Sequence, residues 1–64
     1  MDIRESILVE ILTRGTVGQA EIEEHFRGLD VREHIQWLVD AALLERSGSA
    51  DSPMLARGRR LKRG

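Results

Sequence analysis

The sequence predicts a small α+β domain, mainly α, in which three helices are followed by a β-hairpin. Two observations carry this prediction. Apolar residues recur at helical spacing in the first two thirds of the chain, and two short apolar runs then flank a small polar loop, residues 48–53. We assign residues 1–58 to this domain and residues 59–64 to a basic C-terminal tail.

The first helix is expected to run from Asp2 to about Arg14. Asp2 is followed three residues later by Glu5, which is the spacing of a capping box, and Gly15 is a typical helix stop. The expected apolar face covers nearly half of the helix circumference and consists of Ile3, Ile7, Leu8, Ile11 and Leu12. Val9 lies beyond that arc. We therefore predict that part of this helix, with Val9, contacts a second copy of the chain.

A short strand and a second helix are expected next. Thr16 and Val17 suit a strand, after which Gly18 is expected to cap a helix that carries Glu21 at its third position. Residues 27–29 form the expected turn.

The third helix is expected to begin at Asp30, which repeats the Asp-x-x-Glu signal with Glu33, and to run to about Ala42. Its packing face is made of Val31, Ile35, Leu38 and Ala42. The opposite face carries polar residues that are free to contact a partner, namely Arg32, Glu33, Gln36 and Asp40. Residues 43–47 and 54–57 are the expected strands of the hairpin.

The charge is divided unevenly along the chain. The net charge is −1, but residues 54–64 carry five basic residues and no acid, so residues 1–53, with five arginines and eleven acids, carry −6. A generic nucleic-acid binder is basic over most of its surface. If DNA is the partner, its contacts must be local, and the three glutamates of the second helix, Glu21, Glu23 and Glu24, count against it.

Other classes of protein find little support in the sequence. There is no cysteine, and two histidines are too few for a metal site. No Gly-rich phosphate loop or nucleophile with a nearby base is present, so we expect neither an enzyme nor a bound cofactor. No apolar run is long enough to span a membrane, and the first residues lack the order of a signal peptide. We therefore expect a cytoplasmic protein.

The order of these segments resembles compact winged helix-turn-helix transcription regulators, such as the MarR- and PadR-like repressors and small archaeal and phage regulators. The resemblance covers almost the whole chain. It rests on V-R-E-H-I-Q-W-L-V-D-A-A-L-L-E-R followed, after a polar loop, by P-M-L-A-R-G-R-R-L. The chain departs from the common pattern in a turn that is about two residues shorter before the third helix, in Ala42 where glycine is usual, and in Ala56 where threonine is common.

The resemblance implies a DNA-binding regulator that reads double-stranded DNA with its third helix and contacts the backbone with the wing and tail. The residues assigned to DNA are Arg32, Glu33, Gln36, Arg46, Arg57, Arg59, Arg60, Lys62 and Arg63. Trp37 lies off the packing face, so it either folds against the first helix or the tail of its own chain, or contacts a partner, in which case a homodimer is expected. The alternative is a winged-helix module that binds a protein partner instead of DNA.

Overall fold

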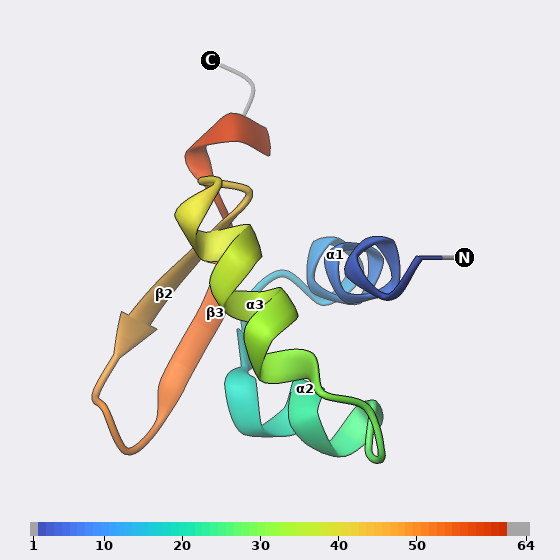
Figure 1. Ribbon diagram of the computed structural model, residues 1–64. Coiled ribbons are helices and arrows are strands. Elements are labelled where there is room, and N and C mark those ends of the chain that lie inside the picture. The colour runs from blue at the N-terminus through green and yellow to red at the C-terminus, as the bar shows by residue number, and fades with distance from the viewer. Residues whose placement is uncertain (1, 62–64) are drawn as a thin grey trace.

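Three helices and a three-stranded antiparallel sheet make up residues 2–61, the part of the chain that the computed structural model describes (Figure 1). The predicted α+β class is therefore confirmed. The elements follow in the order α1 (Ile3–Arg14), β1 (Val17–Gly18), α2 (Gln19–His25), α3 (Val31–Asp40), β2 (Leu44–Gly48), β3 (Pro53–Arg57) and a 3₁₀ turn, η1 (Arg59–Leu61). Of the basic residues assigned to DNA, Lys62 and Arg63 lie outside the described residues.

Helix α1 begins and ends where its capping residues predict. The side chain of Asp2 accepts a hydrogen bond from the Arg4 N–H at 3.2 Å, which satisfies one of the unpaired donors of the first turn. At the other end, Gly15 adopts a φ of 90° and its N–H donates to the Ile11 carbonyl at 2.7 Å. These two local signals fix the length of the helix.

Helix α2 is also capped as expected, but only one of the two hydrogen bonds of a capping box is formed. The Gly18 N–H donates to Oε2 of Glu21 at 3.2 Å, while Gly18 has no side chain to return a bond. The preceding strand β1 contains Val17 and Gly18, one residue later than expected, because these two residues pair with Leu55 and Met54 of β3.

Helix α3 begins where predicted, with Asp30 in the N-cap position, but its C-terminal end was predicted wrongly. Asp30 makes no side-chain capping bond, because its ψ of 79° departs from the extended conformation that aims such a side chain at the first helical N–H groups. The helix ends at Asp40, not at Ala42. Ala42 adopts a φ of 64°, which is outside the right-handed helical region and turns the chain into β2.

A glycine at position 42 is expected to stabilise the protein, because a left-handed backbone conformation strains an alanine but not a glycine. We expect Ala42→Gly to raise the free energy of unfolding by about 0.5 to 1 kcal/mol, measured by urea denaturation. Ala41→Gly is the matched control. Ala41 has a φ of −81°, so that substitution is expected to lower stability. Equal effects of the two substitutions would contradict the strain at Ala42.

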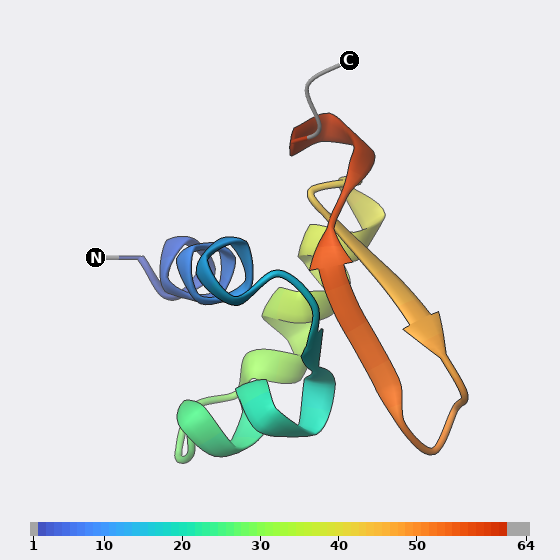
Figure 2. The same cartoon turned by 180° about the vertical axis from the view of Figure 1, so that it is seen from behind.

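The sheet has the order β1-β3-β2, so β3 is its central strand. Strands β2 and β3 form the expected hairpin, with Leu44 opposite Arg57 and Gly48 opposite Pro53. Figure 2 shows β3 beside β2 from behind. In both views α1 is seen along its axis, whereas α3 is seen from the side, so the two helices cross at a steep angle.

Every element except η1 contributes to one core. Its buried side chains are Ile7, Ile11, Val17, Ile22, Val31, Ile35, Leu38, Leu44 and Leu55. Helix α1 buries a narrower stripe than its predicted apolar face, because Leu12 of that face is 38% exposed; Val9, predicted to lie beyond it, is 54% exposed. The packing therefore fixes α3 between α1 and the sheet and leaves the polar face of α3 in solvent.

Candidate nucleic-acid interface

A polar stripe runs along the exposed face of α3, beside strand β2. Arg32, Gln36 and Asp40 follow one another at intervals of four residues, so they share one side of the helix. Gln36 donates through Nε2 to Oδ1 of Asp40 at 2.9 Å and accepts at Oε1 from Nη1 of Arg46 at 3.0 Å. Arg46 belongs to β2, so these bonds join the helix to the hairpin.

An open groove of about 590 Å³ lies between the N-terminal half of α3 and the hairpin. It is lined by Gln19, Arg32, Gln36, Arg46, Ser47, Gly48, Ser49, Ala50 and Pro53. Four of these are residues whose side chains donate hydrogen bonds through guanidinium or amide groups. The groove therefore offers donors from α2, α3 and β2 to one bound molecule.

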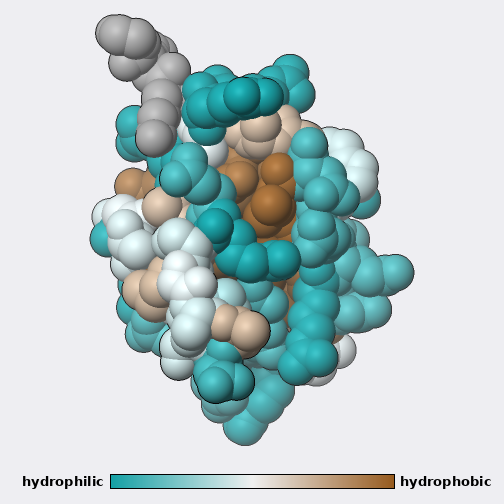
Figure 3. Space-filling view, turned by 90° about the vertical axis from the view of Figure 1, so that its left-hand side faces the viewer, coloured by the Kyte–Doolittle hydropathy of each residue, from teal (hydrophilic) through white to brown (hydrophobic). Residues whose placement is uncertain are grey.

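A second hollow, of about 350 Å³, continues along α3 toward its C-terminal end. It is lined by Val39, Asp40, Ala42, Leu44, Glu45, Arg46 and Arg59. Figure 3 views this side of the molecule and shows apolar surface bordered by hydrophilic side chains. Because Arg46 lines both hollows, Arg32, Arg46 and Arg59 lie in sequence along one side of the molecule.

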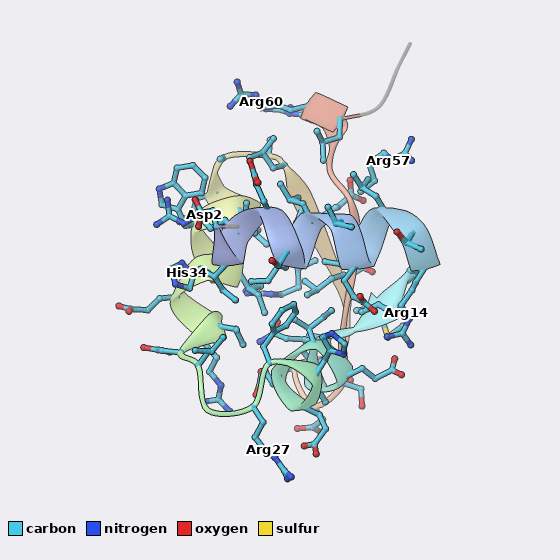
Figure 4. All side chains as sticks on the ribbon, turned by 90° about the vertical axis from the view of Figure 1, so that its right-hand side faces the viewer. Asp2, Arg14, Arg27, His34, Arg57 and Arg60 are labelled. Carbon is cyan, nitrogen blue, oxygen red and sulfur yellow. The ribbon has the colours of Figure 1, made fainter. Side chains whose placement is uncertain are left out.

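The other two described basic residues assigned to DNA, Arg57 and Arg60, line neither of these hollows. Arg60 lies at the C-terminal end of α3, where its N–H donates to the Ala42 carbonyl at 3.1 Å and its Nη1 donates to the Ala41 carbonyl at 3.4 Å. A cation at this position also opposes the negative end of the helix dipole. Arg57 instead shares a hollow with Leu12 and Gly15 of the α1 end. Figure 4 shows both residues near the C-terminal end of the chain.

The glutamates of α2 are paired with arginines. Glu21 accepts from Arg14 at 3.1 Å, Glu24 lies 3.6 Å from Arg27, and Glu23 accepts from Arg32 at 3.3 Å. Sequence reasoning misses this pairing, because it treats the three carboxylates as free charges that repel phosphate. Glu33, by contrast, is exposed and makes no hydrogen bond or ion pair within residues 2–61.

The hydrogen bond from the Gly18 N–H, together with the hydrogen bond and positive charge of Arg14, lowers the pKa of Glu21 from its ordinary value of 4.5. A carboxyl group whose pKa is lower in the folded state stabilises the fold above its unfolded pKa, and this contribution is lost as the pH falls through the lowered folded pKa.

The Glu21→Gln variant is therefore expected to lose less stability than the wild type as the pH falls. The glutamine cannot ionise, so the variant should be less stable than the wild type at neutral pH and approach it below pH 4.5. Thermal melts of both proteins across this range measure the difference. A constant gap between the two proteins at every pH would contradict the assignment.

Trp37 and Val9, the residues assigned to a partner contact, lie on the α1 side of the molecule. The Arg4 guanidinium stacks over the Trp37 ring, 4.1 Å from its centroid, and its Nε donates to Nδ1 of His34 at 3.2 Å. Trp37 nevertheless remains 47% exposed. It therefore contacts α1 of its own chain and also presents aromatic surface to solvent.

Gln19 and Glu23 were not predicted as site residues from the sequence, and Asp40 was placed on the exposed face of the third helix but not assigned to DNA. Gln19 donates through Nε2 to Oε2 of Glu23 at 3.1 Å, and its Oε1 is buried with no hydrogen-bond partner among the described residues. The pairs Gln19–Glu23 and Gln36–Asp40 both have i,i+4 spacing, which is a readable signal. The pair of Glu23 with Arg32 joins two helices and has no such signal.

No protein-family model matches the chain, and no characterised protein or solved structure is similar enough to identify a relative. Within residues 2–61, no helix is both long and apolar enough to cross a bilayer. The same part of the chain holds no group of three histidine or carboxylate side chains placed to bind a metal ion.

Proposed function

We propose that this chain is a winged-helix domain that binds double-stranded DNA as a small transcription regulator. In this proposal α3 enters the major groove and the β2–β3 hairpin is the wing that contacts the DNA backbone. The order of helices and strands and the central position of β3 support the winged-helix assignment.

The observation that carries the proposal is the row of Arg32, Arg46 and Arg59. These arginines come from α3, β2 and η1, and they line two adjoining hollows on the exposed side of α3. Residues 1–53 carry a net charge of −6, so a row of arginines on one side is a local feature and not part of a generally basic surface. Guanidinium groups suit both phosphate oxygens and guanine edges.

Three acids lie beside the three arginines of this row, so the support for DNA comes from the placement of the guanidinium groups and not from an excess of positive charge. Asp40 and Glu45 line the second hollow with Arg46 and Arg59, and Oδ1 of Asp40 already accepts from Gln36. Glu23 is bonded to Arg32 and Gln19. Paired carboxylates repel phosphate less than free ones because the neighbouring cation offsets their field.

Fluorescence anisotropy of labelled duplex DNA of mixed sequence, titrated with the protein at low salt, tests the proposal. We expect saturable binding that weakens as salt is added, because phosphate contacts release counterions. A duplex with a selected cognate sequence is expected to bind more tightly. Absence of binding below millimolar protein at low salt would overturn the proposal.

That outcome would favour a winged-helix module that binds another protein. This alternative is supported by two exposed apolar side chains: Trp37 is 47% exposed, and Leu29 in the α2–α3 turn is 57% exposed. Large apolar side chains at such exposure are common at protein contacts.

We also propose a homodimer formed through α1. Val9 and Leu12 are one helical turn apart on the outer face of α1 and are both exposed. Sedimentation is expected to show twice the monomer mass of 7.3 kDa at micromolar concentration. Val9→Glu should shift the protein to monomer, because a pair of glutamates would meet across the interface. A monomeric wild type at millimolar concentration would contradict the dimer and leave DNA binding by a monomer possible.

A further inference from the structure

Glu23 is the one carboxylate of α2 that faces the candidate interface, and it is fixed through both of its oxygens. Oε2 accepts from Nε2 of Gln19 at 3.1 Å, and Oε1 accepts from Nε of Arg32 at 3.3 Å. The Glu23 side chain is 30% exposed, whereas that of Arg32 is 77% exposed. A sheltered acid on α2 therefore contacts the inner part of a guanidinium that projects from α3 into solvent.

Arg32 bonds to Glu23 through Nε, which leaves the other donors of its guanidinium available to a ligand. A guanidinium has five N–H donors, and Nε supplies only one of them. Within residues 2–61, the terminal nitrogens Nη1 and Nη2 of Arg32 make no hydrogen bond. Together, Nη1 and Nη2 form a planar pair of donors, a fork that can bind two acceptors at once.

Guanine presents two such acceptors, O6 and N7, at the edge that faces the major groove. Adenine presents one acceptor and one donor there, so the fork would place a donor against the adenine amino group. An arginine already held by a carboxylate also loses less side-chain freedom on binding. The arrangement therefore favours guanine over other bases.

We propose that Glu23 is a positioning residue that holds the Arg32 guanidinium for a guanine in duplex DNA. The proposal rests on the DNA-binding function proposed above. It gives the acidic residue of α2 a role opposite to the one its charge suggests: Glu23 adds base preference to Arg32, while an acid that merely repelled phosphate would weaken binding to every sequence alike.

The test begins with the wild-type protein and a library of duplexes with a randomised central segment, sequenced after selection on the protein. Arg32→Ala identifies the position at which Arg32 acts. At that position the wild type is expected to prefer guanine by about tenfold, which corresponds to a bidentate contact. If the wild type selects no sequence and binds no duplex, the DNA-binding proposal fails before Glu23 is examined.

Two substitutions at Glu23 then separate positioning from charge. Glu23→Gln removes the charge, and Glu23→Asp keeps the charge but withdraws the carboxylate from Arg32. We expect both to reduce the guanine preference to about twofold or less, because glutamine offers Arg32 only a weaker, neutral hydrogen bond and the shorter aspartate does not reach it. Glu23→Asp should leave affinity for random DNA unchanged. Glu24→Gln is the matched control, since Glu24 is on the same helix, is 74% exposed and pairs with Arg27 instead.

The opposite result would overturn the proposal. If Glu23 only repels phosphate, Glu23→Asp will behave as the wild type, and Glu23→Gln will bind every sequence more tightly with its guanine preference intact. Thermal melts of each variant show whether it is folded at the temperature of the assay. If Glu23→Gln is unfolded there, the base preference of Glu23→Asp alone decides between the two roles.

Discussion

Gly58→Ala is expected to destabilise the protein more than any other single substitution proposed for this chain. A Cβ atom built on Gly58 would lie 2.6 Å from the Leu43 carbonyl carbon and 2.7 Å from the Leu44 backbone nitrogen, and closer still to the Ala42 carbonyl oxygen. All three atoms belong to the backbone, so no rotation of a side chain relieves the contact. The Gly58 N–H also donates to the Leu43 carbonyl at 3.0 Å, so moving Gly58 away breaks that bond.

The size of this effect follows from the small total stability. Crowding in a packed interior typically costs about 1 to 3 kcal/mol, and this contact is at the upper end or beyond because only backbone atoms could move; a chain of this length has roughly 3 to 10 kcal/mol of stability in all. Circular dichroism should show a loss of helix or a melting temperature lowered by more than about 15 °C. Gly28→Ala is the matched control. Gly28 has a φ of 92° but no atom near its added Cβ, so only backbone strain is expected there. Equal losses at the two positions would show that crowding at Gly58 is unimportant.

Local signals in the sequence were sufficient to predict the helices and the hairpin. Asp2 and Gly15 each act within four residues of their own position, so the bounds of α1 could be read from the sequence. Ala42 shows where this reasoning fails. Its left-handed conformation is imposed by the junction of α3 with β2, while alanine normally favours a helix, so the sequence predicted a longer helix than the structure has.

The candidate site was predictable only in part, because its most informative contacts join different elements. Arg32, Gln36 and Arg46 could be assigned from the pattern of polar residues, and the structure places them around one groove. The pairing of Glu23 with Arg32 depends on the angle between α2 and α3. The placement of Arg57 and Arg60 outside the two hollows depends on the path of the chain at and after the end of β3, which the sequence of a basic segment does not specify.

Neutralising Arg46 and Arg59 together is expected to remove most of the affinity for DNA of any sequence. The two arginines line the same hollow beside α3, where the wing and the end of the chain would meet the DNA backbone in the proposed function. A hydrogen bond to a charged group contributes about 1.5 kcal/mol or more, or about tenfold in affinity for each arginine, so Arg46→Gln with Arg59→Gln should cost about a hundredfold at low salt.

The salt dependence provides a second and independent measurement. Removing one arginine from a DNA phosphate should reduce the slope of log affinity against log salt by about 0.9, so the slope of the double variant should fall by about 1.8. The matched control is Arg27→Gln with Arg57→Gln, which changes the net charge equally. Arg27 pairs with Glu24 and Arg57 lies beside α1, both away from the row. If the affinity and slope of the control fall as far as those of the double variant, net charge alone governs binding, and the row of Arg32, Arg46 and Arg59 is not the surface that binds DNA.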